Sequence, residues 1–451
     1  MSIDLSTVTR GLRGRLVSNA RLDVVPSASE FESDGARLVV ASTDDLLGYG
    51  SDARVREAMA TAARRYGLGR TAASRVLLDF EARAASLLGA PDALVVASES
   101  ALLQLLPTWR LAAPVRNLRP LADAVHVTTP EDAEQALAQP GMIGLVLELV
   151  HQLEGDLALA PRFAEVCQRR QVALLVVDDG LGVLGPTGGG AVEHLSLQAE
   201  VALRVLPLGQ AIPGAGALVL GEPELLAALR GALSAPPAAM LAASLKALEL
   251  ATSETARRER LFDVAQRLLL GLRSRGFDTG PCVTPWIPVW LGDEALCEAW
   301  LGALAGAGVF CRGWLAGPRS RLLLAPPATL TDAQVSTILE AFERASRKLQ
   351  VPVAPAVTKE PPALARPGSY AMATPAALHW TTVDLPDRRP PAPAETPMAP
   401  PSSLENSSLR ERVYDAVETL TWRTVNVGGA QLRRGADALR TLLIDPDKRR
   451  R

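Results

Sequence analysis

The sequence predicts an α/β protein built around a buried, largely parallel sheet. The clearest signal is residues 172–177, an uninterrupted apolar run that ends in the carboxylates of Asp178 and Asp179 and a glycine-rich turn. Such a run is typical of a parallel strand covered on both faces, and the carboxyl edge of such a sheet is where α/β folds bind ligands. Near residue 225 the pattern changes to longer helices, followed by strand, helix and strand, which indicates a second, smaller unit.

Composition excludes several classes of function. The chain has 451 residues, enough for two or more domains, and carries a formal net charge of -2. This near-neutral balance gives no electrostatic footprint for nucleic acid. The N-terminus lacks a continuous apolar segment and no later run approaches about eighteen apolar residues, so we expect a cytoplasmic protein without a transmembrane segment. The cysteines form no C-x-x-C pair, so neither a metal site nor a disulfide framework is predicted.

The remaining elements are predicted from the same patterns, in chain order. Residues 31–58 are typical of a hairpin strand, a loop and the start of an amphipathic helix. Residues 93–97 and 144–149 are apolar enough to be strands. The helical patterns at 224–233 and 240–275 lead into the second unit.

Several motifs are similar to those of one family. Residues 182–190, Gly-Val-Leu-Gly-Pro-Thr-Gly-Gly-Gly, resemble the glycine-rich turn that follows the aspartate strand of the α-oxoamine synthases. These are pyridoxal-phosphate (PLP) enzymes of fold type I, of the 8-amino-7-oxononanoate synthase and serine palmitoyltransferase kind. Residues 64–69, 154–156, 284–293 and 321–329 are similar to further motifs of the family. The resemblance implies a three-layer αβα sandwich with a smaller α+β C-terminal domain, assembled as a dimer.

The family motif T-x-S-K supplies the lysine that holds PLP as a Schiff base. Anchored on residues 216–221, this motif falls on Pro207, Gly209 and Gln210, so the resemblance gives the lysine position to Gln210. A glutamine amide cannot form an imine, because its nitrogen lone pair is delocalised into the carbonyl group. Only Lys246, of the four lysines, lies in the predicted body of the fold, on a helix where a solvated lysine is expected. No catalytic residue is therefore predicted.

The other site positions of the family are kept only in part. Ser98 falls in the turn whose backbone amides hold the cofactor phosphate in the family, but Glu99 replaces a glycine there and would repel a dianion. Asp178 is the candidate carboxylate for the pyridine nitrogen, although an ungapped count puts Val177 there. Arg321 matches the arginine that binds the substrate carboxylate. We therefore expect no cofactor, or PLP held without a covalent bond if the chain is an enzyme.

Domain boundaries follow from these matches. We predict an N-terminal segment (1–45), a large domain (46–245), a small domain (246–350), a proline-rich disordered linker (351–402) and a helical tail (403–451). Apolar residues recur at helical spacing between Leu409 and Leu443. The tail helices are therefore expected to bind a partner protein, with the body of the chain or a membrane surface as alternatives.

Three functions stay open at this level. The missing lysine favours a catalytically inactive subunit of the α-oxoamine synthase type, as a homodimer or as a heterodimer with an active homologue that it supports. The second is a PLP-dependent acyl-CoA:amino acid acyltransferase with atypical cofactor binding. The third is a scaffold that acts through its C-terminal helices.

Overall fold

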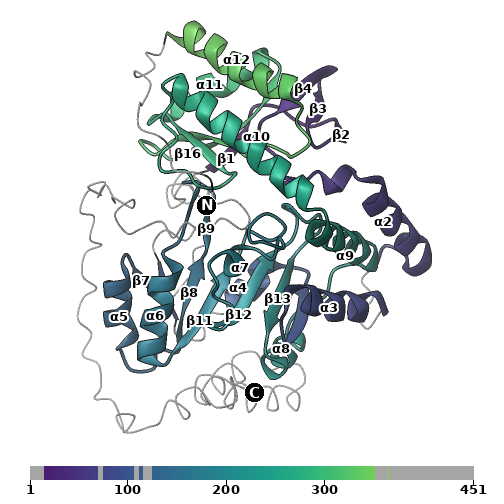
Figure 1. The fold of residues 1–451 in the computed structure, drawn as a ribbon, viewed down its shortest axis with the longest axis vertical. Helices are drawn as coiled ribbons and strands as arrows, with labels where there is room; N and C mark the ends of the chain where they lie inside the picture. Colours follow the sequence, from purple (N-terminus) through teal and green to yellow (C-terminus); the bar gives the residue numbers. More distant parts are fainter. Residues whose placement is uncertain (1–14, 70–74, 106–110, 115–123, 351–363, 365–451) are drawn as a thin grey trace, which may run out of the picture.

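The computed structural model describes residues 15–69, 75–105, 111–114, 124–350 and 364. Figure 1 shows a larger part around the strands β8, β11 and β12 and a smaller part around the helices α10, α11 and α12. The predicted tail, and the predicted linker apart from Leu364, lie outside the described residues.

A seven-stranded mixed sheet forms the centre of the larger part. Its order is β5 (Asp92–Val96), β13 (Ala217–Gly221), β12 (Val201–Pro207), β11 (Ala173–Val177), β8 (Gly144–Glu148), β6 (Leu111–Pro114) and β7 (Val125–Val127). Of these strands only β13 runs antiparallel to its neighbours, so the other six share one carboxyl edge. The predicted apolar strand is β11, in the middle of the sheet.

Helices cover both faces of this sheet, which explains why β11 is apolar throughout. Leu174 and Val176 belong to one buried cluster, whereas Leu175 and Val177 belong to another. The first cluster is closed by α3 (Arg75–Leu88), α5 (Pro130–Leu137), α6 (Ala160–Arg170), α7 (Ala191–His194) and α9 (Ala238–Ser253), and the second by α4 (Glu99–Leu105) and α8 (Pro223–Arg230). The predicted three-layer αβα sandwich is confirmed.

The smaller part joins the C-terminal segment to the start of the chain. Its sheet has the order β1 (Arg15–Ser18), β16 (Arg312–Leu315), β17 (Arg321–Leu324) and β14 (Ile287–Trp290). A second sheet has the order β15 (Val309–Phe310), β4 (Ala36–Val40), β3 (Glu30–Ser33) and β2 (Val24–Ser27). The helices are α10 (Thr255–Ser274), α11 (Glu294–Gly306) and α12 (Asp332–Leu349). The first strands of the chain therefore pair with strands from beyond residue 300.

A turn at residues 45–48 connects the two parts before η1 (Tyr49–Ser51) and α2 (Ala53–Tyr66). Asp52 caps α2 by accepting a hydrogen bond from the Arg54 backbone N–H at 2.9 Å. Gly48 has a φ of 73°, and a Cβ there would lie 2.6 Å from the Thr329 methyl group. Glycine is thus required for the turn to approach the segment after β17 so closely.

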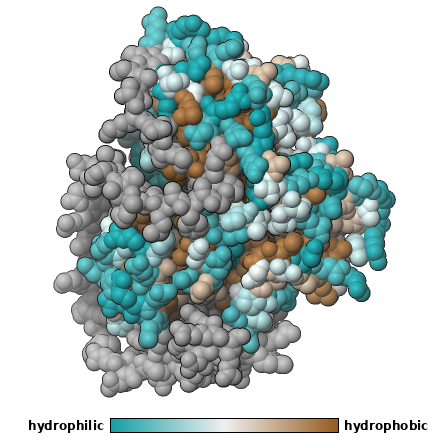
Figure 2. Space-filling view, viewed as in Figure 1, coloured by the Kyte–Doolittle hydropathy of each residue, from teal (hydrophilic) through white to brown (hydrophobic). Residues whose placement is uncertain are grey.

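Polar residues cover the visible surface of α12 and of the outer end of α2, as Figure 2 shows. Apolar surface is visible over the region of α3 and α9, on the right of the same view. Within the described ranges no helix is both long and apolar enough to cross a membrane.

Candidate functional site

The carboxyl edge of the large sheet brings the predicted site segments together. Ser98 follows β5, Asp178 and Asp179 follow β11, and Gln210 lies in the loop between β12 and β13. These three strands run in the same direction, so the segments after them meet at one edge. The hairpin of β9 (Val150–His151) and β10 (Asp156–Leu157) follows β8 at the same edge.

Gln210 is held by two side chains at this edge. Gln152, at the tip of the β9–β10 hairpin, donates from Nε2 to the Gln210 Oε1 at 3.0 Å. Gln210 in turn donates from Nε2 to the Asp179 Oδ1 at 3.4 Å. The position that the resemblance gives to the lysine is therefore filled by an amide that bridges the hairpin and the strand β11.

Asp178, the predicted partner of a pyridine nitrogen, faces the protein interior. Its side chain is fully buried and accepts hydrogen bonds from the Arg204 guanidinium, at 2.8 Å from Nη2 and 3.1 Å from Nε. The same carboxylate accepts from the backbone N–H groups of Gly180, Ala191 and Val192 at 2.8–2.9 Å. These hydrogen bonds occupy both carboxylate oxygens of Asp178. The adjacent Asp179 instead accepts a hydrogen bond from Gln210.

The glycine-rich turn that suggested the family packs around this buried ion pair. Gly190 has a φ of 100°, and a Cβ there would lie 2.5 Å from the Arg204 Nη2 and 2.7 Å from the Asp178 Oδ2. Arg258, at the start of α10, donates to the carbonyl oxygen of Pro186 at 3.0 Å. The turn therefore links β11 to the first helix of the smaller part.

Ser98 lies where the resemblance predicts, in the turn between β5 and α4. Its hydroxyl oxygen accepts a hydrogen bond from the Ala101 backbone N–H at 3.1 Å. Glu99 is the first residue of α4, so its charge lies at the end where free backbone amides would meet a phosphate.

Arg321, the predicted substrate-binding residue, is buried between the two parts. Its Nη1 donates to the Leu153 carbonyl oxygen at 2.9 Å and to the Glu154 carboxylate at 3.2 Å. Its guanidinium carbon lies 3.5 Å from the centre of the Trp290 ring. These contacts fix β17 to the tip of the hairpin that carries Gln152.

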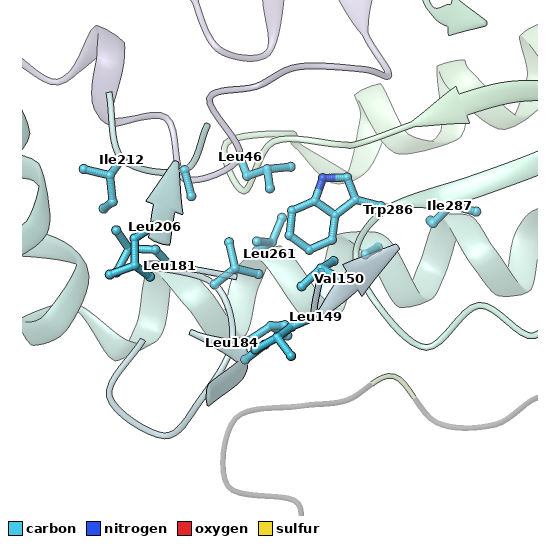
Figure 3. Packing of buried hydrophobic residues seen from close by; sticks show 14 of the residues in the cluster. Leu46, Leu149, Val150, Leu181, Leu184, Leu206, Ile212, Leu261, Trp286 and Ile287 are labelled. Atoms are coloured by element: carbon cyan, nitrogen blue, oxygen red, sulfur yellow. The ribbon is translucent and has the colours of Figure 1, made fainter. Parts of the chain in front are cut away.

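Apolar side chains fill the space beside these polar groups. Figure 3 shows Trp286 close to Val150, with Leu46 and Leu261 on one side. A Cβ added to Gly182 would lie 3.1 Å from Ile212 and 3.3 Å from Leu47. A cavity of about 650 Å³ lies elsewhere, at the junction of α9 and α10, and is lined by Ser253, Glu254, Thr255, Ala256, Arg257, Arg260, Ala328 and Thr329.

The two lysines among the described residues lie outside this edge. Lys246 is on α9, where its ammonium group lies 3.4 Å from the Glu249 carboxylate, and Lys348 is near the end of α12. The described part of the chain also has no cluster of three metal-ligating side chains. Gln152 and Asp179 were not predicted as site residues. The sequence feature that could have identified Gln152 is its position shortly after the predicted strand at residues 144–149.

The three-layer sandwich is the fold expected of a PLP transferase of fold type I, and the comparisons specify the family. No family model matches the sequence. The 8-amino-7-oxononanoate synthase of Anaeromyxobacter dehalogenans strain 2CP-1 is 33% identical over 345 residues, which cover 68% of this chain and 86% of the relative. The synthase of Halorhodospira halophila is 32% identical over 365 residues, which cover 72% and 90%. The chain therefore belongs to the α-oxoamine synthase family of PLP-dependent transferases.

Solved structures agree on the fold. A serine palmitoyltransferase with a PLP internal aldimine superposes with a TM-score of 0.69 at 21% identity, over 74% of this chain and 93% of that chain. The 8-amino-7-oxononanoate synthase of Francisella tularensis superposes with a TM-score of 0.60 at 18% identity, over 69% and 98%.

The expectation that the chain uses no cofactor is corrected by these relatives. The family uses PLP, as the solved internal aldimine illustrates. The residues at this edge fit such a cofactor in part: Asp179 is a carboxylate of the kind that pairs with a protonated ring nitrogen and lies 3.4 Å from Gln210, but the Gln210 amide does not fit a covalent attachment. The sequence argument failed because it took the missing lysine and the charge of Glu99 to exclude PLP, although neither rules out a cofactor held without a covalent bond.

Proposed function

We propose that this chain is an acyl-CoA:amino acid acyltransferase of the 8-amino-7-oxononanoate synthase type that holds PLP without a covalent bond. The observation that carries the proposal is 33% identity to a synthase of which 86% is covered. We give this similarity more weight than the missing lysine, which favoured the hypothesis of an inactive subunit. We keep the expectation of a cytoplasmic protein.

The reaction class follows from the product that names these relatives. 8-Amino-7-oxononanoate is an α-amino ketone. A dicarboxylic acyl thioester and alanine are the substrates whose atoms account for this product. A bond forms between the thioester carbonyl carbon and the α-carbon of alanine, the alanine carboxyl group leaves as CO2, and the thiol of coenzyme A is released. PLP supplies the electron sink for such a bond change when it is bound.

The residues of this chain have proposed binding roles. We propose that Asp179 contacts the ring nitrogen of PLP. Asp178, which the sequence predicted for this role, is the alternative. The turn at Ser98 offers backbone amides for the phosphate. Arg321 is the candidate for the substrate carboxylate, and to bind it the guanidinium must exchange its contact with Glu154.

Loss of the lysine is compatible with PLP binding in this fold. A lysine-to-alanine variant of the serine palmitoyltransferase of S. paucimobilis holds PLP and myriocin as an aldimine. By analogy, amine ligands should retain PLP on this chain even though Gln210 supplies no amine.

The test compares the purified chain with its Gln210→Lys and Gln152→Ser/Gln210→Lys variants. We expect the parent to bind PLP that dialysis removes and borohydride does not fix, and to release coenzyme A thiol slowly from an acyl-CoA in the presence of L-alanine. A lysine at 210 would lie beside Asp179, which keeps the ammonium protonated and weakly nucleophilic. Replacing only Gln210 should therefore give little turnover. The double variant should give somewhat more, because it also removes the Gln152 amide that contacts residue 210. No thiol release from the parent at any PLP concentration contradicts the proposal.

A second candidate function is a subunit that supports a lysine-bearing homologue. The observation that favours it is the bridge from Gln152 through Gln210 to Asp179, which occupies the lysine position without a nucleophile. Here the parent alone shows no turnover, but it co-purifies with an active homologue and raises that homologue's activity. Measuring thiol release with and without the homologue separates the two candidates.

A further inference from the structure

One end of the β9–β10 hairpin tip is fixed by the segment before β14. The carbonyl oxygen of Gly155 accepts hydrogen bonds from the backbone N–H groups of Val283 and Thr284 at 2.9 Å and 3.1 Å. Gly155 has a φ of 71°, and a Cβ there would lie 2.3 Å from the Trp286 carbonyl oxygen. Gly155 is buried, whereas residues 152–154 are half-buried. Gly155 is therefore the fixed point about which residues 152–154 can turn.

Contacts to Gln210 and Arg321 hold residues 152–154 in their present position. Gln152 donates to the Gln210 Oε1 at 3.0 Å. The Nη1 of Arg321 donates to the Leu153 carbonyl oxygen at 2.9 Å and to the Glu154 carboxylate at 3.2 Å. Because residues 152–154 are consecutive, we expect a change in the contacts of Arg321 to reach Gln152 and its bond to Gln210.

A ligand carboxylate can reach Arg321 only by replacing one of its present contacts. The side chain is 1% exposed, and the Trp290 ring covers one face of the guanidinium. The Nε donates to the carbonyl oxygen of Arg319, two residues earlier in the chain, at 2.9 Å. Glu154 is 18% exposed and is an acceptor of the same chemical kind as the ligand. A ligand carboxylate is therefore expected to take the place of Glu154.

Arg319 allows this exchange without leaving Glu154 unpaired. Its Nη2 lies 3.6 Å from the Glu154 Oε1, and its side chain is 56% exposed. Two carboxylates on the Arg321 guanidinium would repel each other, so Glu154 would move towards Arg319 and the solvent. This repulsion gives the ligand different affinities for the two positions of the hairpin tip, which is the condition for shifting it.

We propose that residues 152–154 form a latch that a carboxylate opens: the carboxylate of the amino acid takes the place of Glu154 on Arg321, and the tip turns so that Gln152 leaves Gln210. In the described structure the latch is closed. Opening frees residue 210 from Gln152 only when the amino acid is present. The inference rests on the proposed function, which brings the carboxylate of the amino acid to Arg321.

The experiment follows the Gln152 side-chain amide by NMR in the full chain, labelled with 15N in its glutamine side chains and supplied with PLP. The signal that is lost in Gln152→Ala assigns the resonance. The ligands are L-alanine and L-alaninamide, which keeps the amine but has no carboxylate. Glu154→Gln removes the charge that holds the tip and keeps the size of the side chain. Glu131→Gln, on α5, removes an exposed pair with Arg162 and is the matched control.

We expect L-alanine to move the Gln152 signal towards the position of a solvated glutamine amide, and L-alaninamide to leave it in place. In Glu154→Gln the signal should lie part of the way there without a ligand. This variant should also bind L-alanine about 10-fold more tightly than the parent, because the ligand no longer displaces a charge-assisted hydrogen bond. Glu131→Gln should behave as the parent does.

Binding of L-alanine without movement of the Gln152 signal, or an equal movement with L-alaninamide, would overturn the inference and leave the acyltransferase proposal intact. Parent-like affinity of Glu154→Gln for L-alanine would overturn it as well. A parent that neither binds L-alanine nor releases thiol would overturn both proposals. Thermal unfolding of each variant separates these outcomes from loss of fold.

Discussion

Two adjacent carboxylates after β11 have different surroundings. Asp178 holds Arg204 and three backbone amides in the interior, whereas Asp179 contacts Gln210 at the sheet edge. This difference follows from their places in the chain, because Asp178 comes directly after β11 whereas Asp179 already belongs to the turn that follows.

The first prediction separates the roles of this pair. Asp178→Asn leaves the buried Arg204 charge uncompensated and should lower the free energy of unfolding by about 3–5 kcal/mol. Asp179→Asn should lower it by less than about 1 kcal/mol and weaken PLP binding. Denaturant unfolding and a PLP titration measure both effects; a stable Asp178→Asn variant that has lost PLP binding would show that Asp178 contacts the cofactor.

The second prediction concerns Asp45, in the turn between the two parts. Burial raises its pKa to about 6, and the backbone N–H groups of residues 48–50 only partly oppose this. Its Oδ1 is buried without a partner in the described structure, whereas Oδ2 accepts from the Gly50 N–H at 2.9 Å. Because the folded state binds this proton more tightly than the unfolded state, stability contributed by the protonated form is present below pH 3.8 and is lost as the pH rises towards about 6.

Asp45→Asn should therefore stabilise the protein by roughly 2–3 kcal/mol above pH 7 and by little below pH 4. Denaturant unfolding at both pH values measures the difference. Asp79→Asn, an exposed position on α3, is the control and should change stability by less than about 0.5 kcal/mol at either pH. Equal stabilisation by Asp45→Asn at both pH values would contradict the assignment.

At the scale of single elements, the β12–β13 hairpin depends on a glycine. Gly216 has a φ of 83°, and a Cβ there would overlap the carbonyl oxygen of Val96 on β5. The close approach of β13 to the strand that precedes Ser98 is therefore possible only without a side chain.

Gly216→Ala should lower the free energy of unfolding by more than about 3 kcal/mol, since it combines a positive φ with a backbone clash. Gly302→Ala, in the middle of α11 with open space around the Cβ position, is the matched control and should raise it by about 0.5–1 kcal/mol. Chemical denaturation measures both. Similar effects of the two substitutions would mean that the hairpin moves away from β5 at little cost.

At the scale of the whole molecule, one residue beyond α12 belongs to the core. Leu364 is 1% exposed, and its backbone N–H donates to the Gln266 side chain on α10 at 3.4 Å. The sequence predicted a linker with few contacts to the body, and Leu364 is a contact that composition did not reveal.

The fourth prediction compares chains that end at residue 351 and at residue 370. The shorter chain should fold but lose about 1.5–3 kcal/mol, the burial of one leucine side chain, and Leu364→Ala in the full chain should reproduce most of that loss. Thermal and denaturant unfolding give the comparison. Equal stability of both chains would show that Leu364 adds nothing to the core.

The fifth prediction concerns assembly, for which the resemblance implies a dimer. Met59, Leu68 and Leu78 are 42%, 76% and 58% exposed around α2 and α3, and apolar side chains so placed are suited to a protein interface. Light scattering should give the mass of a dimer. Leu68→Glu/Leu78→Glu should shift it towards the monomer, whereas Leu270→Glu on α10 should not; a parent that is monomeric contradicts the prediction.

The sequence by itself determined the fold and the family, because both depend on local patterns. The apolar run of β11 requires cover on both faces, and the glycines of residues 182–190 leave few alternatives for the turn that follows. The resemblance to the family motif, anchored on residues 216–221, assigned Gln210 to the lysine position. The error about the cofactor came from treating Gln210 and Glu99 as decisive against PLP.

Only the tertiary structure decided which side chains meet. Gln152 and Gln210 are 58 positions apart along the chain, and their hydrogen bond depends on the order of strands in the sheet. The same holds for Asp178 and Arg204, and for Glu154 and Arg321. Sequence periodicity gives the face on which a residue lies, but distances across a sheet are set by strand order and register, which arise only when the layers pack.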